Sequence, residues 1–384
     1  MLALEYTPSG PRHLAARVST RAGVGALRLE AHARPPRLPG PEWASVRPLL
    51  AGICGSDQAL VTGEASPYLA ALTSGPFVPG HEVVGLLTSG EGRGGRVVVE
   101  PALGCQARGI DPPCPECEEG LYALCRNVTG GDVSAGLQIG FCRDTCGGWS
   151  EGLTAHASQL HPIPDDLSDE DAVLVEPLAC ALHAARRAEV RPGQAVAVIG
   201  AGTIGLLCVA ALRAVQPEAT VLCVVKHQAQ ELEARRLGAD HTAKSGRLHL
   251  EGARICGARR IVGPLGRELL LGGFDRVLDC VGSGSSLEAA ITAVRPRGRV
   301  ILVGMPGSIS ADLALAWQRE VRIDGAYGYQ RDFPAAIELA RSLRLGRLVA
   351  RGWHLRDFRE ALADAPRAAR AGRVKTVFDL RSDG

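Results

Sequence analysis

The sequence carries little net charge and almost no lysine. Its 384 residues include 43 basic and 41 acidic side chains, for a formal net charge of +2. This balance excludes a strong electrostatic attraction to nucleic acid or to an anionic membrane. Lysine occurs only at Lys226, Lys244 and Lys375. Nearly all basic residues are therefore arginines, which we expect on the solvated surface.

Targeting and membrane-spanning patterns are also missing. The N-terminal MLALEYTPSG lacks the charged stretch and following apolar stretch of a secretion signal, so we expect a cytoplasmic protein. The longest apolar run, Ala195 to Leu212, contains Gly200, Gly202 and Gly205, which a lipid-facing helix does not need. In a reducing compartment the 12 cysteines indicate metal binding or buried thiols rather than disulfides.

The first part of the chain has the texture of a β-rich domain. The length suggests two domains, and a hydrophobic content of 46% is sufficient for a sizeable core. Residues 1 to about 165 are rich in glycine and proline and contain short β-prone runs, at Val46 to Leu50, Glu82 to Leu87 and Arg96 to Val99. This pattern predicts an all-β unit with long loops.

From Asp171 the pattern alternates between helix and strand. A helix is predicted at Glu170 to Ala188, with Asp165, Asp166 and Ser168 as capping candidates. Strands follow at 196–199, 221–225, 276–281 and 299–303, separated by helices at 203–215, 228–237 and 285–294. This alternation is typical of a doubly wound parallel sheet. Residues 241–272 show no clear pattern. A helix at Phe333 to Leu343 and a strand at Val374 to Leu380 are expected to return to the first domain.

The three glycines of the apolar run have G-x-G-x-x-G spacing. Because they follow the strand at 196–199 and precede the helix that begins near Thr203, they predict a tight turn. Such a turn presents the helix N-terminus to the pyrophosphate of a dinucleotide. By itself the motif is weak, but the strands on either side of it strengthen the prediction.

Candidate metal ligands lie in the β-rich part and at its junction with the second half. Cys54 stands in AGICGSD, His81 and Glu82 in VPGHEVVG, and Glu176 in LVEPLACALH. Thiolate, imidazole and carboxylate together suit zinc, and three protein ligands leave one position for water or substrate. Taken singly, each residue is compatible with a purely structural role.

These motifs resemble the zinc-dependent alcohol, polyol and sugar dehydrogenases of the medium-chain dehydrogenase/reductase superfamily. The similarity runs from about Pro39 to Leu380 and includes CGSD, GHE, a cysteine-rich lobe at 105–125, EPL, GAGTIG and LDCVG. It implies a GroES-like β-rich catalytic domain, residues 1–175 and 327–384, and a Rossmann cofactor domain, residues 176–326. It also implies contacts to the cofactor from Gly200, Gly202, Thr203, Ile204, Gly205, Val225, Lys226, His227, Val281 and Gly304.

The resemblance further implies that Cys54 and His81 bind a catalytic zinc, with Glu82 or Glu176 on the metal or one water away. Asp57 is then expected to orient the His81 ring, and Ser56 to accept the proton of the alcohol. One departure stands out, because many relatives carry a histidine where this chain has Ala59. The proton must therefore pass through water, the cofactor ribose or another side chain, or else the physiological reaction is not simple alcohol oxidation.

A second zinc is expected in the cysteine-rich lobe. Cys114, Cys117 and Cys125 match the structural zinc site of the relatives. Cys105 lies farther away along the sequence than usual, and Cys142 and Cys146 are possible replacements. The alternative is a lobe that becomes ordered without metal and whose cysteines stay reduced and redox-sensitive.

The cofactor is expected to be NADP rather than NAD. NAD-binding relatives end the second strand with an acid that binds the ribose hydroxyls. Here that position is Val225, followed by Lys226 and His227, with no acid nearby. Arg235 or Arg236 are possible further contacts. The alternative is that Lys226 is an ordinary surface cation and that either cofactor binds.

Together these features predict hydride transfer between NADP(H) and a secondary alcohol or ketone, on a polyol, sugar or cyclitol. One alternative is a reductase of an activated C=C or C=N bond with a structural zinc only. Another is a nucleotide-binding redox sensor without catalysis. The resemblance also implies a homodimer or homotetramer, with no nucleic-acid or membrane partner.

Overall fold

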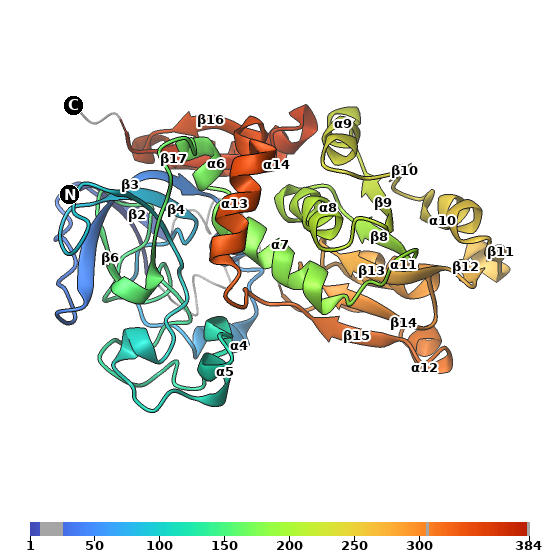
Figure 1. Cartoon of the computed structure of the whole chain (residues 1–384), viewed down its shortest axis with the longest axis horizontal. Coiled ribbons are helices and arrows are strands. Elements are labelled where there is room, and N and C mark those ends of the chain that lie inside the picture. The colour runs from blue at the N-terminus through green and yellow to red at the C-terminus, as the bar shows by residue number, and fades with distance from the viewer. Residues whose placement is uncertain (8–25, 305–306, 382–384) are drawn as a thin grey trace.

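Two large β-sheets form the framework of the protein (Figure 1). The computed structural model describes residues 1–7, 26–304 and 307–381. The N-terminal sheet contains strands of mixed direction, whereas the second sheet is entirely parallel. No helix within these ranges is long and apolar enough to cross a membrane.

The parallel sheet has the strand order β10-β9-β8-β13-β14-β15. Counted along the chain this is 3-2-1-4-5-6, the order of a doubly wound dinucleotide-binding fold. The crevice of such a sheet lies outside the carboxyl ends of β8 and β13, where the order reverses. The strands are β8 (Ala195–Ile199), β9 (Thr220–Val225), β10 (His241–Lys244), β13 (Phe274–Asp279), β14 (Val294–Leu302) and β15 (Arg322–Gly325).

Helices cover both faces of this sheet because alternate strand residues point in opposite directions. Val196 and Val198 belong to the core shared with α7 (Val175–Arg187) and α8 (Thr203–Val215), joined by α9 (Gln228–Arg236). Ala197 and Ile199 belong to the opposite core. That core includes residues of α10 (Leu248–Cys256), α11 (Gly284–Ala293) and α12 (Ala314–Gln318).

The other large sheet gathers strands from both ends of the chain. Its order is β16-β17-β3-β4-β5-β7, and β6 also pairs with β3. The C-terminal β17 runs antiparallel to β3, which confirms the predicted return of the chain. The strands are β3 (Trp43–Gly52), β4 (Val83–Leu87), β5 (Arg96–Val99), β6 (Leu153–His156), β7 (Leu160–Pro162), β16 (Val349–Trp353) and β17 (Lys375–Asp379).

Smaller elements complete this half of the molecule. A separate antiparallel pair is formed by β1 (Ala3–Tyr6) and β2 (Leu27–Glu30). The short helices α3 (Gly55–Thr62) and α4 (Pro67–Ala70) follow β3, and α14 (Phe358–Ala368) precedes β17. Helix α13 occupies Phe333–Leu343, the predicted range.

Helix α7 joins the two halves. Its Leu178 and Leu182 lie in one continuous core with Leu50 and Val84 of the mixed sheet and with residues of α8 and α13. This shared core fixes the two sheets relative to each other. Any site formed by residues from both sheets depends on this arrangement.

The predicted single helix Glu170 to Ala188 is wrong. The structure has two helices there, α6 (Asp169–Ala172) and α7, which begins at Val175. Pro177 explains the interruption, because a proline ring clashes with the carbonyl four residues earlier, here that of Val173. The predicted cap Ser168 is confirmed, since its side chain accepts the N–H of Asp171 at 3.1 Å.

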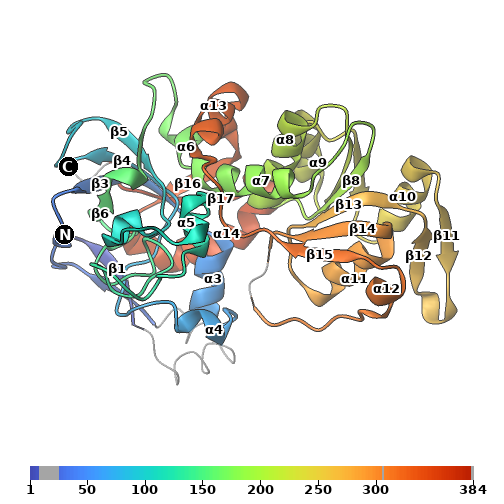
Figure 2. The same cartoon turned by 60° about the horizontal axis from the view of Figure 1, so that its bottom comes forward.

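Residues 241–272, which showed no sequence pattern, contain β10, α10 and an antiparallel hairpin. The hairpin consists of β11 (Arg259–Val262) and β12 (Glu268–Leu271) and lies at one end of the molecule (Figure 2). Leu265, near its tip, is 99% exposed. Strands are predicted from alternating apolar and polar residues, and exposed apolar residues such as this one make that pattern hard to recognise.

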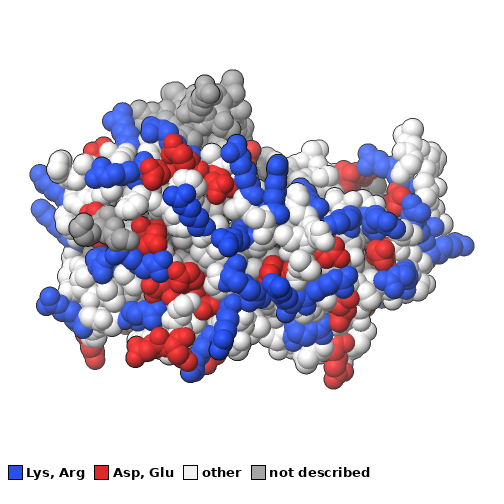
Figure 3. Space-filling view, turned by 90° about the horizontal axis from the view of Figure 1, so that it is seen from above, with Lys and Arg blue, Asp and Glu red and all other residues white. Residues whose placement is uncertain are grey.

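Charges of both signs are mixed over the face shown in Figure 3. Many arginines form ion pairs, such as Arg96 with Asp169 and Arg347 with Glu233. The expectation that arginines lie on the surface is wrong for Arg108, Arg276 and Arg319, which are buried. Their guanidinium groups donate to backbone carbonyls, and these hydrogen bonds compensate for the lost hydration.

Helix α7 allows a test of the junction between the halves. Burial, assisted by Arg187 and Arg186, lowers the pKa of His183 from 6.5 to about 4. Between these values only the unfolded chain binds the proton, so the folded state loses stability as the pH falls below 6.5. Between pH 7 and pH 5 the parent should lose about 2 kcal/mol of unfolding free energy because of His183. We expect the variant His183→Gln not to show this loss. Urea unfolding at both pH values measures it. If the unfolding free energy of His183→Gln changed between pH 7 and pH 5 as much as that of the parent, the lowered pKa of His183 would be contradicted.

Candidate metal and cofactor sites

The glycine motif forms the predicted turn between β8 and α8. Gly200 has φ of +100°, a conformation that L side chains rarely adopt. A Cβ on Gly205 would lie 1.9 Å from the Gly200 carbonyl oxygen, so only glycine permits this close approach. Gly202 caps α8, which begins at Thr203 as predicted. The N-terminus of α8 thus opens onto the carboxyl edge of the sheet, where a pyrophosphate would lie.

Asp279 organises the two neighbouring loops at this edge. Its buried carboxylate accepts the N–H groups of Val281 at 3.0 Å and Gly282 at 3.1 Å, and the hydroxyl of Ser286 at 2.8 Å. Its own carbonyl accepts the N–H of Gly304. Two predicted cofactor contacts, Val281 and Gly304, are therefore held together, and the Val281 side chain is 42% exposed.

The end of β9 carries no acid. Val225 is buried, and the following Lys226 side chain is exposed. The side chain of Gln230 accepts the N–H groups of Lys226 at 3.0 Å and His227 at 3.1 Å and so shapes the turn into α9. Arg235 and Arg236, proposed as further contacts, are paired with Glu231 and Glu233.

Three predicted metal ligands come together between α3 and β4. One ligand atom from each of Cys54, His81 and Glu82 lies within 4.8 Å of the other two. Cys54 caps α3, while His81 and Glu82 directly precede β4, and both are at least 95% buried. We call these three residues the metal-ligand cluster. A thiolate, an imidazole and a carboxylate converging in a buried position fit a zinc ion.

Asp57 lies beside His81, but the expected hydrogen bond between the two side chains is not formed. It is fully buried, and one carboxylate oxygen accepts the Cys54 N–H at 3.0 Å. The other oxygen lies 3.5 Å from Nδ1 of His81, and neither of these two buried atoms has a hydrogen-bond partner among the described residues. With Nδ1 facing Asp57, Nε2 is the ring nitrogen left to bind a metal.

Sequence reasoning missed Lys375, the first residue of β17. Its buried ammonium group donates to Oε1 of Glu82 at 2.6 Å and also contacts Oε2. Burial opposes the charge on Lys375, but Glu82 outweighs this effect and raises its pKa. The available signal was weak: Lys375 is one of only three lysines in the sequence.

Glu176 lies near the cluster but is not one of its three members. It is in the first turn of α7, 8% exposed, and Cys180 donates its thiol to Oε1 at 3.4 Å. Burial raises the Glu176 pKa to about 7, with a further contribution from Glu82 and opposing effects from His81 and Lys375. These effects show that the two carboxylates share one electrostatic environment.

Ser56 and Ala59 lie on α3 beside the cluster. Ser56 is exposed in the first turn, and Ala59, three residues later, is buried. Ser56 is therefore accessible as a proton acceptor. The α3 position at which many relatives carry an imidazole contains only a methyl group.

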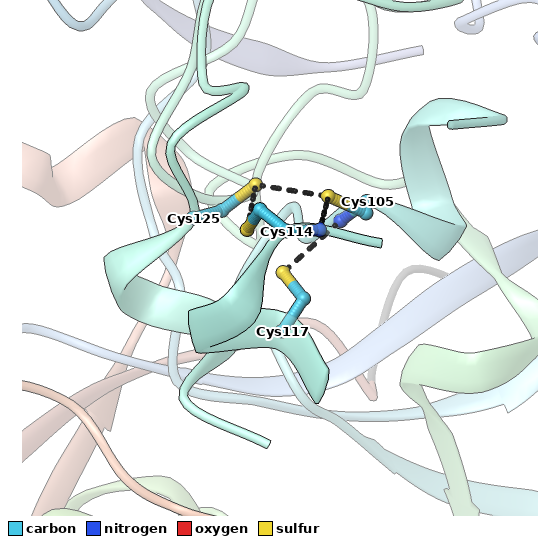
Figure 4. A group of neighbouring side chains, drawn as sticks. All are labelled: Cys105, Cys114, Cys117 and Cys125. Carbon is cyan, nitrogen blue, oxygen red and sulfur yellow. Dashed lines mark hydrogen bonds between the residues drawn. The ribbon is translucent and has the colours of Figure 1, made fainter. Parts of the chain in front are cut away.

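The four cysteines of the lobe, residues 105–125, converge on one point (Figure 4). The Cys105 sulfur is 3.6 Å from that of Cys125, which is 4.0 Å from the sulfur of Cys114. Tetrahedral zinc with Zn–S bonds of about 2.3 Å separates its sulfurs by about 3.8 Å. Cys105 is thus the fourth member of this group, and Cys142 and Cys146 lie outside it.

Burial and hydrogen bonds shift the pKa values of the lobe thiols in different directions. Burial opposes the ionisation of Cys105, but hydrogen bonds from Cys114 and Asn127 outweigh it and lower its pKa to about 7. Burial raises the pKa of Cys125 to about 11 and also raises that of Cys117. Four buried thiolates repel one another, and a bound divalent ion removes this repulsion.

Comparisons with known proteins agree with this geometry. Residues 40–165 match the alcohol dehydrogenase GroES-like domain, and residues 203–342 match the zinc-binding dehydrogenase domain. The chain is 29% identical over 375 residues to L-idonate 5-dehydrogenase of Vitis vinifera, covering 93% of each protein. It is 31% identical over 341 residues to a protein of Mycobacterium tuberculosis named a probable zinc-binding alcohol dehydrogenase, covering 84% of this chain and 78% of the relative.

A solved structure shows the same fold. It is a Sinorhizobium meliloti protein, assigned by name to the zinc-binding dehydrogenases and bound to NADP. The TM-score is 0.70 and the sequence identity 26%, with 92% of this chain and 95% of that chain covered.

The Glu82–Lys375 pair can be tested by removing the lysine. We expect Lys375→Met to lower the free energy of unfolding by about 3–5 kcal/mol, because it leaves a buried carboxylate without its partner. Lys244→Met is the matched control, since Lys244 is 3.6 Å from Glu231 on the surface and such pairs contribute at most about 1 kcal/mol. Urea unfolding measures both. Equal stability of the two variants would show that Lys375 is not essential to the site.

Proposed function

Because the chain belongs to the zinc-dependent medium-chain alcohol and polyol dehydrogenases, we propose that it transfers hydride between NADP(H) and a secondary alcohol or ketone of a polyol, sugar or cyclitol. One connection carries this proposal. The Thr203 hydroxyl, at the start of α8, donates to the Val374 carbonyl at 2.7 Å. The next residue, Lys375, contacts Glu82 of the metal-ligand cluster. The cofactor turn and the cluster are thus built on the same short segment.

The substrate class is supported by the relatives. L-idonate 5-dehydrogenase of Vitis vinifera and sorbitol dehydrogenases of Arabidopsis thaliana and Bacillus subtilis are among them, at 28–29% identity. All three are named for the oxidation of a hydroxyl group on a polyhydroxylated carbon chain. We therefore place the substrate of this chain among polyols and sugars.

In the proposed mechanism Cys54 and His81 would hold a zinc ion together with Glu82 or Glu176. A zinc ion there would supply a Lewis acid that favours ionisation of the substrate hydroxyl, and a nicotinamide cofactor at the glycine turn would supply the hydride acceptor. Asp57 holds the His81 ring in one orientation. Ser56 accepts the alcohol proton and passes it to solvent, because Ala59 has no group that can carry it.

The catalytic domain is proposed to comprise residues 1–175 and 327–384, and the cofactor domain residues 176–326. Pairing of β17 with β3 supports the assignment of the C-terminal residues. A homodimer or homotetramer is also proposed. Trp317 on α12 is 83% exposed and Ile323 on the edge strand β15 is 37% exposed, which suits an interface at this edge.

Metal analysis tests the two zinc sites separately. We expect two zinc ions per chain. Cys54→Ser should lose one ion and more than about 100-fold of turnover, because even residues that only support metal ligands contribute 10–100-fold. Cys125→Ser should lose the other ion and lower the thermal midpoint. Cys142→Ser is the matched control, a buried cysteine outside both groups, and should keep two ions.

The same measurement separates the alternatives. One ion per chain together with full turnover of Cys54→Ser would favour the C=C or C=N reductase with a structural zinc only. Fewer than two ions together with no turnover of any alcohol would favour the nucleotide-binding sensor, because that alternative expects a degraded metal site.

The cofactor choice is tested at Lys226. We expect NADP to exceed NAD in kcat/KM, and Lys226→Ala to reduce the NADP value about 10–100-fold through loss of a charged hydrogen bond to the 2′-phosphate. The NAD value should stay near that of the parent. Lys244→Ala is the matched control, because Lys244 lies opposite Val225 in β10 and is already paired with Glu231. Equal losses in both variants, or a parent that prefers NAD, would overturn the assignment.

A further inference from the structure

A short segment before β17 contacts the half of the molecule that contains the parallel sheet. It consists of the helical turn η7 (Ala369–Ala371), which contacts α9, and of residues 372–374. In Figure 1 the red C-terminal part of the chain reaches α9 from the side of β16 and α14. We call residues 372–374 the bridge segment, because its two ends contact different helices of the parallel sheet.

Gly372, the first residue of the bridge segment, lies directly against the first turn of α9. It is buried, and its φ of +77° is a conformation that L side chains rarely adopt. A Cβ there would lie 3.0 Å from the Cβ of Ala229, the second residue of α9. One turn later on the same face of α9, Glu233 accepts a hydrogen bond from Nε of Arg347 at 2.9 Å. Two contacts therefore hold the start of α9 against the β-rich half.

Val374 forms the other end of the bridge segment and lies at the start of α8. Its carbonyl accepts the Thr203 hydroxyl at 2.7 Å. Thr203 begins α8 directly after the glycine turn, where the pyrophosphate of a dinucleotide would lie. Arg373 stands between the two fixed residues, and consecutive Cα atoms are only about 3.8 Å apart. Its backbone is thereby held between the first turns of α8 and α9.

The side chain of Arg373 is available for a ligand in this position. It is exposed, and it forms no ion pair or hydrogen bond with any residue that the structure describes. The same holds for the side chain of Lys226, which lies three residues before Ala229 and so within about 11 Å of it along the chain. Arg235 and Arg236, by contrast, are already paired with glutamates of their own helix. One unpaired cation from each half therefore lies next to the start of α9.

We propose that Arg373 binds the 2′-phosphate of NADP together with Lys226, so that one cation from each half holds the same phosphate. In a doubly wound fold the adenosine ribose lies at the end of the second strand, and an arginine near that position accommodates the 2′-phosphate. A guanidinium group donates two parallel hydrogen bonds to a phosphate, whereas the lysine supplies a point charge. NAD has no group to make this contact. The inference rests on the proposed function, because it adds a residue to the proposed NADP site.

The test compares the dissociation constants of Arg373→Gln and the parent by calorimetric titration. The ligands are two pairs that differ only in the 2′-phosphate: NADP with NAD, and 2′,5′-ADP with 5′-AMP. Loss of charged hydrogen bonds should weaken the binding of NADP and of 2′,5′-ADP about 10–100-fold. The values for NAD and 5′-AMP should not change, which also shows that the variant is folded. Arg259→Gln is the matched control, because Arg259 is an exposed arginine of the distant hairpin strand β11, and it should leave all four values unchanged.

The outcomes separate this inference from the proposed function. If the parent prefers NADP and Arg373→Gln keeps that preference in full, the inference fails and the proposed cofactor stands. Equal losses for NADP and NAD assign Arg373 to the pyrophosphate or to the fold and also overturn the inference. If the parent binds NAD as tightly as NADP, the proposed cofactor preference fails, and the inference fails with it.

Discussion

The buried contact between Lys375 and Glu82 is the interaction on which both candidate sites depend. It joins residues that are far apart in the sequence, one in the last strand and one directly before β4. Unpaired, either charge would be strongly destabilising in this position. The pair therefore requires that β17 lie against β3 and that the C-terminal chain return to the first sheet. Through Val374 and Thr203 the same segment reaches the start of α8.

The charge balance around this pair would favour a cation at the metal-ligand cluster. Cys54, Glu82 and Glu176 are acidic groups close together, and Lys375 is the ammonium group that faces them. The raised pKa of Glu176, about 7, shows how strongly this environment resists a further negative charge. A divalent ion bound by the cluster would compensate this negative charge, as protonation of a carboxylate does in the absence of a metal. Metal binding and the protonation of Glu176 are thus expected to be linked.

The lobe with four cysteines has little core of its own apart from its sulfurs. It nevertheless contacts the segment between β15 and α13 through backbone carbonyls at Glu118 and Glu119. The four thiols, by holding residues 105–125 together, therefore also affect the position of the segment between β15 and α13. The lobe holds the segment that leads from the parallel sheet to α13.

Local sequence was sufficient to predict four strands of the parallel sheet, β8, β9, β13 and β14, and the glycine turn, but not β10 or β15. It also singled out Cys54, His81 and Glu82, and the cysteines of the lobe, as groups that the fold brings together. Each is specified by neighbours in the chain: alternation for strands, glycine spacing for the turn, and ligand chemistry for the metals. The tertiary structure alone decided that Lys375 pairs with Glu82 and that Cys105 completes the group of four thiols. Residues 293 positions apart in the chain meet only through sheet pairing and core packing, so no local pattern records their contact.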